Sequence, residues 1–225
     1  SYSAAKRGTA AANVCNVADV VCADLSTDAT TGALVITTIG GSDCAVVTCT
    51  VKTLYDQSGA NACAGPVACD LTNAVIANRP ILTVNCIGSL PCMTYNLNEM
   101  VSFASLTLVQ PITYSSVANS TNTGVQQSLL ETPLDVQIGY RNSADNQVFI
   151  FAGSVLSATA SDANWHALQG VFNSTSSDLN VDGTSNTGNA GTQTANATIK
   201  YGSAGSTQFF NGKTTESGIW GVAFS

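Results

Sequence analysis

Apolar and polar residues alternate in short runs along most of the chain, and apolar positions with helical spacing are almost absent. Gly, Asn, Asp and Ser separate the runs, which follow one another at roughly 10–15-residue intervals. A parallel α/β fold needs amphipathic helices between its strands, and the sequence lacks them. The pattern therefore predicts an all-β fold: an antiparallel β-sandwich of jelly-roll type, forming a single domain over residues 1–225.

The runs predict thirteen strands, and the linking segments predict turns. A short helix is the best interpretation of Asn16–Asp24, because three valines there share a face. The segment 141–146 predicts a hairpin turn, Asp182-Gly183 predicts a tight turn, and Thr184–Asn196 reads as an exposed loop. The expected strands are Ala33–Thr38, Cys49–Tyr55, Ile81–Val84, Met93–Tyr95, Val101–Leu108, Ile112–Ala118, Val125–Leu130, Asp135–Tyr140, Gln147–Phe151, Trp165–Phe172, Asp178–Val181, Thr198–Tyr201 and Thr214–Val222.

Charge is scarce. Hydrophobic residues make up 44% of the chain and can form a sizeable core, but charged residues make up only 9%, against about 25% in typical soluble proteins. The net charge of -7 repels phosphate, which argues against nucleic acid and anionic membranes as partners. The apolar stretch Val148–Ala158 is too short and too interrupted to span a membrane. Because the chain starts at Ser1 rather than Met, we expect a processed protein or an excised domain.

The eight cysteines fall into four close couples. An even number in couples predicts disulfide bonds and an oxidising, extracellular compartment. Zinc is the rival interpretation, but no Cys-x-x-Cys spacing occurs and the chain has a single histidine. Eight cysteines allow 105 connectivities, of which sequential pairing is the simplest. That pairing would fasten local loops in the N-terminal half, joining Cys15–Cys22, Cys44–Cys49, Cys63–Cys69 and Cys86–Cys92.

Three segments together resemble a known superfamily. VKTLYDQSGANAC at 51–63, with ANRPIL at 77–82, resembles the Y-D-Q-S-G segment of fungal B-type α-L-arabinofuranosidase catalytic domains and of related bacterial and phage proteins. The segment 164–183 resembles the W-H…V-D-G strand pair of laminin-G-like jelly rolls, and 209–225 resembles their closing strand. The resemblance implies a concanavalin A-like lectin/glucanase fold, a fold that hosts glycosidases, lectins and structural modules.

Catalytic residues do not carry over from this resemblance. A retaining glycosidase uses two carboxyl groups about 5–5.5 Å apart, and the chain has three glutamates, Glu99, Glu131 and Glu216. The family's nucleophile is a strand glutamate near two adjacent cysteines; the comparable strand, 133–140, offers only Asp135. The family's acid lies in a Gly-Gly-Asp loop, and the comparable loop at 202–206 has no carboxylate. We therefore assign no catalytic residue.

Ligand binding has a better candidate at the predicted hairpin. Sugar recognition needs an aromatic platform flanked by planar hydrogen-bonding groups. Trp220 is a second platform candidate, although a closing-strand tryptophan is more often part of the core. The predicted ligand-binding cluster combines an aromatic ring, a guanidinium, amides and a carboxylate: Tyr140, Arg141, Asn142, Asp145 and Asn146.

Three other residues invite a chemical interpretation. Asp56 can bind a sugar or a structural calcium ion, and turn formation explains an aspartate at this position equally well. No cofactor other than this calcium ion is expected. His166 lacks a nucleophile motif and is expected to be structural. We expect Trp165 to be buried between the two sheets, with His166 on the opposite face, because adjacent strand residues alternate.

The sequence thus predicts a non-catalytic module, secreted or displayed on a cell surface or virion, for glycan or surface recognition or structural assembly. Two alternatives stay open. One is an arabinofuranosidase-like glycoside hydrolase, and the other is a self-assembling subunit of an appendage, fibre or particle surface. The low charge favours assembly, because uncharged polar surfaces associate with little desolvation cost and little repulsion.

Overall fold

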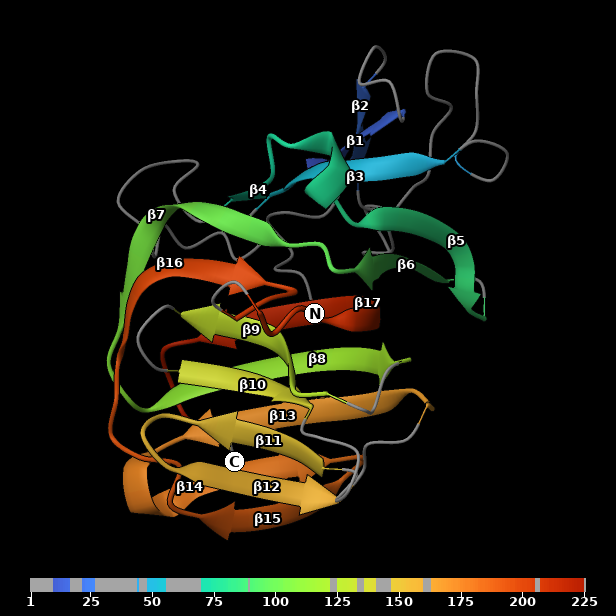
Figure 1. The fold of residues 1–225 in the computed structure, drawn as a ribbon. Coiled ribbons are helices and arrows are strands. Elements are labelled where there is room, and N and C mark those ends of the chain that lie inside the picture. Colours follow the sequence, from blue (N-terminus) through green and yellow to red (C-terminus); the bar gives the residue numbers. More distant parts are fainter. Residues whose placement is uncertain are drawn as a thin grey trace.

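A computed structural model of the chain shows a two-layered antiparallel β-sandwich (Figure 1). The all-β jelly-roll prediction is confirmed. The seventeen strands of the described residues belong to one hydrogen-bonded network. In the described part of the chain no helix is long and apolar enough to cross a membrane. The structure describes residues 10–16, 22–26, 44, 48–55, 70–88, 90–121, 125–132, 136–140, 147–159, 163–204 and 207–224.

The front layer has six strands in the order β12-β11-β10-β9-β16-β7, each antiparallel to its neighbour. Its central strands are buried on both faces, since every residue of β10 is buried and so is every residue of β9 except Glu131. The strands are β12 (Val155–Thr159), β11 (Gln147–Phe151), β10 (Val136–Tyr140), β9 (Gln127–Thr132), β16 (Ala195–Tyr201) and β7 (Met100–Leu108).

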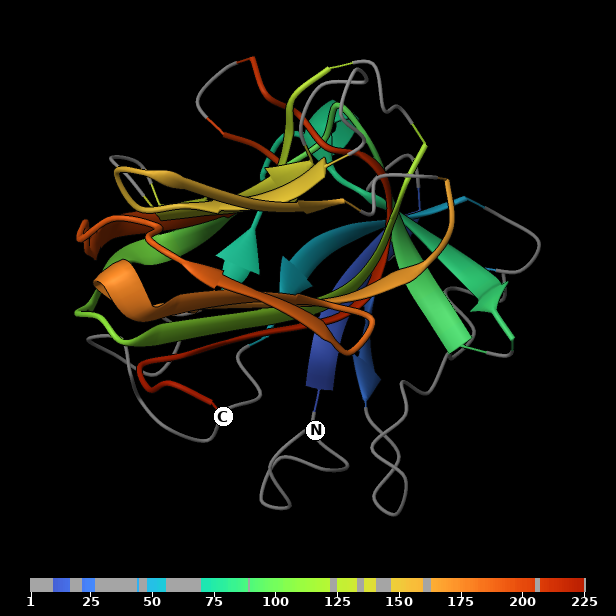
Figure 2. The same cartoon turned by 90° about the horizontal axis from the view of Figure 1, so that it is seen from below.

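The rear layer has seven strands in the order β15-β14-β13-β8-β17-β6-β5. Viewed from below, the two layers lie one above the other with the core between them (Figure 2). The strands are β15 (Thr184–Gly188), β14 (Ser177–Val181), β13 (His166–Phe172), β8 (Ile112–Ser120), β17 (Asn211–Trp220), β6 (Leu90–Asn96) and β5 (Ile81–Ile87).

One strand joins the two layers at the top of the molecule. β3 (Cys49–Leu54) pairs with β5 of the rear layer and with the short β4 (Leu71–Thr72), which pairs with β7 of the front layer. β1 (Ala10–Asn16) pairs with β3 and with β2 (Cys22–Ser26). The layers are therefore continuous through backbone hydrogen bonds on this side.

The opposite side of the sandwich closes differently. The edge strands β12 and β15 are linked by a side chain, since Asn186 Nδ2 donates to the Ser157 carbonyl oxygen at 2.6 Å. Gly188 lets Leu156 approach closely, because a Cβ at residue 188 would lie 2.9 Å from a Leu156 methyl carbon. Packing and one side-chain hydrogen bond thus replace strand pairing at this edge.

Aromatic rings fill the core near the loop that connects β16 to β17. Phe210 stacks on Tyr140 with centroids 6.0 Å apart and also contacts Tyr95, which meets Tyr201 edge to face. All four residues are at most 3% exposed. Buried rings of this size dominate core energetics. This cluster therefore fixes the place at which the loop meets strands β9, β10 and β16 of the front layer.

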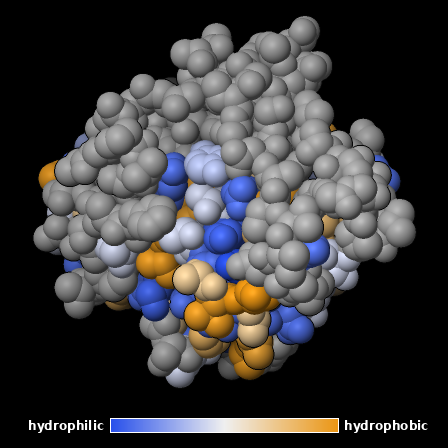
Figure 3. Space-filling model, turned by 90° about the horizontal axis from the view of Figure 1, so that it is seen from above, coloured by the Kyte–Doolittle hydropathy of each residue, from blue (hydrophilic) through white to orange (hydrophobic). Residues whose placement is uncertain are grey.

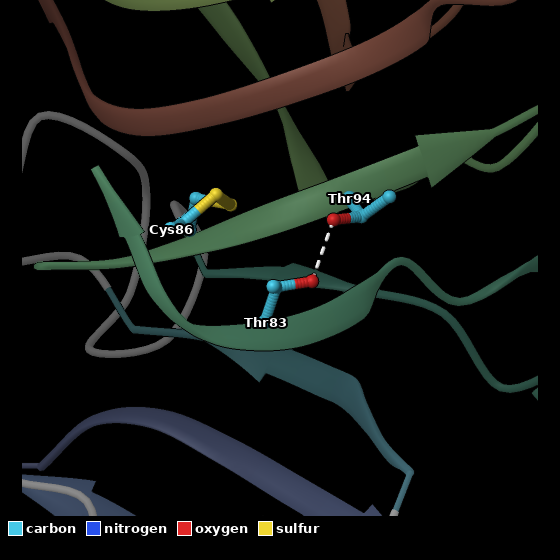
Figure 4. The surroundings of a disulfide bond; sticks show 4 residues. Thr83, Cys86 and Thr94 are labelled. Carbon is cyan, nitrogen blue, oxygen red and sulfur yellow. Dashed lines mark hydrogen bonds between the residues drawn. A yellow bond between two sulfur atoms is a disulfide. The ribbon is translucent and has the colours of Figure 1, made fainter. Parts of the chain in front are cut away.

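The structure confirms two of the predicted disulfides, Cys44–Cys49 and Cys86–Cys92. The second closes the β5–β6 hairpin, next to a Thr83–Thr94 hydroxyl pair at 2.7 Å (Figure 4). Cys15 is disulfide-bonded, and its backbone lies opposite that of Cys22 in the β1–β2 register. No described cysteine is free. The predicted Cys63–Cys69 pair lies outside the described residues.

Several local predictions are wrong. The predicted helix 16–24 does not form, because Asn16 ends β1 and residues 22–24 lie in β2. Part of the predicted loop 184–196 is strand β15, which has no buried face of its own and is held by pairing with β14. The Asp182-Gly183 turn between these strands is confirmed. The predicted strand 33–38 lies outside the described residues.

The prediction for the Trp165–His166 pair is also wrong. Trp165 precedes β13 and is partly exposed, whereas His166 is 8% exposed and has the same strand parity as the buried Leu168. The physical reason is that the large core residues of this strand, Leu168 and Phe172, have the parity of His166, so His166 rather than Trp165 takes the inward position.

Candidate functional site

The candidate site lies on the outer face of the front layer, where one cross-strand row crosses five strands. The register pairs Phe151 with Gln137, Gln137 with Glu131, Glu131 with Lys200, and Lys200 with Val101. Residues directly opposite on antiparallel strands share a face and lie about 4.5–5.5 Å apart at Cβ. The row therefore places an aromatic ring, an amide, a carboxylate and an ammonium side by side.

The neighbouring residues show that this row faces outward. Ile150, Ile138, Leu130 and Tyr201, which precede or follow row residues, all belong to the buried core. Because successive strand residues point to opposite faces, the row residues point away from the core. Lys200 keeps 24% of its side-chain surface exposed, and Gln137 only 9% of its surface, so the middle of the row is covered.

The cover over Gln137 is the connection between β16 and β17. This loop folds as a small hairpin, in which Phe210 N donates to Gly202 O at 2.8 Å, and Ala204 and Gln208 exchange backbone hydrogen bonds. Ser128 N donates to Gln208 O at 3.2 Å, which fastens the loop to β9. Gly202 has φ +93, and a Cβ there would lie 2.5 Å from the Tyr95 ring. Only glycine fits that position without displacing its neighbours.

A cluster of amide side chains forms where this loop crosses the sheet. Gln208 Oε1 accepts hydrogen bonds from Gln137 Nε2 at 2.7 Å and from Gln126 Nε2 at 3.2 Å. Next to it, Gln127 Oε1 accepts from Asn211 N at 2.7 Å, and Gln127 Nε2 donates to Ser120 Oγ at 3.2 Å. Planar amides in fixed orientations present donors and acceptors in defined directions.

A second carboxylate reaches the end of the row from the residue before β7. Glu99 Oε2 lies 3.7 Å from Lys200 Nζ and accepts a hydrogen bond from Ser203 Oγ at 2.5 Å. Ser203 belongs to the loop in which the resembled family carries its catalytic acid. Glu99 and Glu131 thus approach Lys200 from two sides, along the sheet and along the loop, and the trio carries one net negative charge.

A separate loop, built around the buried side chain of Arg79, sets the position of Glu99. Arg79, 2% exposed, donates from Nε to Asn73 O at 2.7 Å and from Nη2 to Ala74 O at 3.1 Å. Asn73 Nδ2 donates to Glu99 O at 2.8 Å, and Glu99 N donates to Asn78 O at 3.1 Å. A buried arginine that satisfies loop carbonyls is a rigid support, so the backbone of Glu99 is held on both sides.

The arrangement can bind polar groups, and its fit to hydrolysis is poor. Hydroxyl groups find amide donors and acceptors, a carboxylate and an ammonium along one line, next to the Phe151 ring. A glycosidase needs two carboxyl groups free to act on the substrate, but Glu99 is already engaged by Lys200 and Ser203. The described residues contain no group of three or more His, Cys, Asp or Glu able to hold a metal ion.

The predicted hairpin site has a mixed outcome. β10 and β11 form the expected hairpin, with Tyr140 paired to Val148. Tyr140 itself has no exposed surface and stacks on Phe210 in the core, so it offers no face to a ligand. The candidate carboxylates Asp56 and Asp135 lie outside the described residues. So do the other four predicted ligand-binding residues, Arg141, Asn142, Asp145 and Asn146.

Other predicted residues fall elsewhere in the fold. His166 lies in the rear layer, with its Nδ1 2.6 Å from Asp182 Oδ2. Trp220 is not a core residue: it is 36% exposed at the end of β17. Glu216 is exposed on the same strand. Seen from above, the described surface is mixed, with hydrophilic residues in a hollowed centre bordered by a hydrophobic group (Figure 3).

Sequence reasoning missed Gln137, Gln208, Lys200 and the role of Glu99. Glutamines carry no spacing signal, and the search for carboxylates considered only the strand and loop of the resembled family. The alternation of β16 could have indicated that Lys200 faces away from Ile199 and Tyr201. Its partners could be found only with the strand register.

Solved structures of arabinofuranosidases share the fold of this chain at low sequence identity. A mutant GH54 α-L-arabinofuranosidase soaked with 4-nitrophenyl α-L-arabinofuranoside matches with a TM-score of 0.66 at 11% identity, over 95% of this chain and 56% of the other. An arabinofuranosidase complexed with arabinofuranosyl-α-1,2-xylobiose matches with a TM-score of 0.64 at 12% identity, over 94% and 55%. The chain thus spans little more than half the length of these proteins. No family model and no curated protein matches the sequence.

Proposed function

We propose that this chain is a non-catalytic, extracellular β-sandwich module that recognises a glycan through the outer face of its front layer. The observation that carries the proposal is the amide cluster of Gln137, Gln126 and Gln208, fixed next to Phe151 and the Glu131–Lys200–Glu99 trio. The shared fold with arabinofuranosidases supports a surface of this kind without assigning its ligand.

The chemistry of the row favours a neutral sugar. Sugar hydroxyls both donate and accept, which matches oriented amides, and C–H faces of sugar rings pack against aromatic rings. The carboxylates at the row can accept hydrogen bonds from sugar hydroxyls, and the Lys200 ammonium can donate to them. A strongly anionic polysaccharide would be repelled by a chain whose net charge is -7.

The disulfide bonds support the extracellular location. Cys44–Cys49 and Cys86–Cys92 close short loops, which is a common use of disulfides in secreted domains and a rare one in the cytosol. A cell surface and a virion are both compatible with this chemistry.

Binding to an array of neutral glycans, followed by titration of the best binder, tests the proposal. Gln208→Ala removes the shared acceptor of the amide cluster and should weaken binding about tenfold or more. Asn173→Ala removes an exposed amide on the β13–β14 turn and is the matched control, which should bind like the parent. The proposal is wrong if no neutral glycan binds, or if the two variants bind equally well.

A hydrolase is the second candidate function, and one observation favours it. Glu131 and Glu99 approach Lys200 from two sides on the same outer face, so two carboxylates share one site. Release of arabinose from a chromogenic arabinofuranoside, lost on Glu131→Gln, would replace the binding proposal with this one. We expect no turnover, because Glu99 is engaged within the protein.

Self-assembly is the third candidate, and the edge strand β15 favours it. Its five residues, TSNTG, carry no charge and no proline, the usual devices that keep an edge strand from pairing with another chain. Size-exclusion chromatography combined with light scattering distinguishes a monomer from an assembly. A monomer at high concentration would exclude this role for the isolated chain.

A further inference from the structure

The outer face of the rear layer carries a second cross-strand row, on the opposite side of the molecule from the candidate site. The register pairs Gly218 of β17 with Ser115 of β8, Ser115 with Gln169 of β13, Gln169 with Asn180 of β14, and Asn180 with Ser185 of β15. Because antiparallel strands lie about 4.8 Å apart, the five positions span about 19 Å.

The parity of the flanking residues shows that this row faces outward. The residues next to the row in sequence are buried in the core, namely Tyr114, Leu168 and Leu179. Ser115, Gln169 and Asn180 keep part of their surface exposed, and Ser185 is exposed. The row is therefore accessible along its length.

Trp220 provides an aromatic surface at one end of this row. The benzenoid part of its indole lies over Gly218, since a Cβ at residue 218 would lie 2.7 and 2.9 Å from Trp220 Cζ2 and Cζ3. The ring thus extends along the strand and over the first position of the row. Glycine is required beneath it, because any side chain there would push the ring away.

The C-terminal segment holds the Trp220 ring in place. Thr113 Oγ1 donates to Val222 O at 2.6 Å and accepts from Phe224 N at 3.1 Å, which fixes the segment against β8. Phe224 then packs against Trp220 with ring centroids 5.0 Å apart, and both rings remain partly exposed, at 39% and 36%. In Figure 2 the red C-terminal segment runs along the outer side of the rear layer.

We infer that this row is a second binding surface, distinct from the front-layer site, and that its ligand is a neutral polysaccharide chain lying across the strands. A sugar ring would stack on Trp220, and the following units would meet the hydroxyl of Ser115 and the amide of Gln169. The amide of Asn180 is held within the protein, since it donates to Ser185 Oγ at 3.0 Å and accepts from Gly183 N at 2.9 Å.

The charge and polarity of the row distinguish this ligand from other partners. None of the five row positions carries a charge, which suits an uncharged polymer and offers nothing to an anionic or cationic one. Three acids lie two residues from row positions, Asp178 and Asp182 beside Asn180 and Glu216 beside Gly218, and they disfavour an anionic polymer. Asp178 accepts a hydrogen bond from Ser185 Oγ at 3.0 Å. Beyond Trp220 the row has no apolar residue, whereas the centre of a stable protein interface is apolar.

Tryptophan fluorescence of the full chain tests the inference directly, because the chain has only two tryptophans, Trp165 and Trp220. Neutral arabinan, arabinoxylan and β-glucan, with anionic polygalacturonate as the charge control, should be titrated into the parent, Trp165→Phe and Trp220→Phe. We expect at least one neutral polymer to change the emission of the parent and of Trp165→Phe but not that of Trp220→Phe.

Affinity electrophoresis in gels containing the same polymers supplies the second measurement. Trp220→Ala should weaken retardation by about tenfold or more in apparent Kd, Gln169→Ala should weaken it severalfold, and Trp165→Phe should leave it unchanged. The change in Trp220 emission should stay the same in Gln208→Ala at the front-layer site, so failure of one site is distinguishable from failure of the other.

Three outcomes would overturn the second site: no neutral polymer changes the emission, polygalacturonate binds as well as the neutral polymers, or Trp220→Ala is retarded like the parent. Gln169→Ala keeps the test informative if Trp220→Ala does not fold, because residue 169 is a half-exposed surface position. A Gln169→Ala protein with unchanged retardation would then count against the row.

Discussion

His166 Nδ1 lies 2.6 Å from Asp182 Oδ2, and the other carboxylate oxygen of Asp182 accepts from Ala167 N at 2.8 Å. One side chain thus holds the start of β13 to the turn that follows β14. Asp182 sits in that turn with φ +52, which asparagine and aspartate tolerate better than most residues. The resembled W-H…V-D-G segment pair is therefore a structural clamp in this protein.

Replacing Asp182 with alanine should destabilise the fold by about 1–3 kcal/mol, because the mostly buried imidazole loses its partner. Urea unfolding of Asp182→Ala and Asp182→Asn measures the effect. Asparagine keeps an acceptor and tolerates the positive φ, so Asp182→Asn should lose less. Neither variant should alter glycan binding, and a binding defect in a stably folded variant would contradict the structural role.

Alkaline pH should weaken the fold through two core tyrosines. Burial raises the pKa of Tyr95 and of Tyr114 well above the usual value of 10.0, with the neighbouring Tyr201 adding to both shifts. Above about pH 10 the unfolded chain loses these protons while the folded chain keeps them, so the unfolded state binds fewer protons and stability falls as pH rises. Below pH 10 this contribution is fully present.

Denaturant unfolding between pH 8 and 11, with phenolate absorbance recorded in parallel, measures this loss. The phenolate signal of these two residues should appear together with unfolding. Tyr95→Phe should reduce the steepness of the decline, since it removes one of the two groups. A stability that stays level from pH 9 to 11 would contradict the prediction.

Gly202→Ala should destabilise the loop over the candidate site, for two separable reasons. Its φ of +93 disfavours any side chain, and the added Cβ would lie 2.5 Å from the Tyr95 ring. Gly183 is the matched control: its φ is +84, and an added Cβ meets nothing within 4 Å. We expect Gly183→Ala to cost about 1 kcal/mol from backbone strain alone.

The loss for Gly202→Ala should exceed that control by about 1 kcal/mol or more, because a buried ring must move. Thermal unfolding of both variants gives the difference. Equal losses would mean that Tyr95 yields freely and that the loop is not fixed by this contact.

Arg79→Lys should destabilise the fold by about 1–3 kcal/mol despite keeping the charge. Lysine lacks the planar fork that serves two loop carbonyls, Asn73 O and Ala74 O. Because the same loop holds the backbone of Glu99, the variant should also weaken glycan binding. Asn73→Ala, which removes the hydrogen bond to Glu99 O, should weaken binding in the same direction.

All eight cysteines should be oxidised in the native protein. Thiol titration under denaturing conditions should find no free thiol, and peptide mapping should join each sequential couple. Replacing Cys86 and Cys92 by serine together should cost about 2 kcal/mol, as the chain-entropy model gives for a short loop. Two or more free thiols, or bridges across couples, would contradict the sequential pairing.

Sequence patterns predict a strand where a short apolar run stands between turn signals. The range Gln147–Phe151 is reproduced without change as β11, since its apolar residues 148–151 are followed closely by Gly153 and Ser154. β12 and β15 escaped prediction for different reasons. Residues 155–158 belong to an interrupted apolar stretch with no clear period, whereas 184–188 are polar throughout and become a strand only by pairing with β14.

The candidate site depends on information that no local pattern contains. Glu99, Lys200 and Gln208 come from segments far apart in the chain and meet because β7, β9 and β16 pair in one register. A resemblance to a family directs attention to that family's motif positions, and residues 202–204, the described part of that loop, lie at the site. The carboxylate that contacts it, however, arrives from residue 99.

The strand β3 determines on which side of the sandwich the two layers can separate first. β3 pairs with β5 of the rear layer and, through β4, is connected to β7 of the front layer, so the layers cannot separate on that side without breaking backbone hydrogen bonds. At the far side, between β12 and β15, separation breaks packing and the Asn186–Ser157 contact. Local fluctuations should therefore begin at β12 and β15, so amide protons there exchange with solvent sooner than those of β3. The two layers are joined by backbone hydrogen bonds on one side only, so any ligand that bridged β12 and β15 would slow amide exchange in these strands.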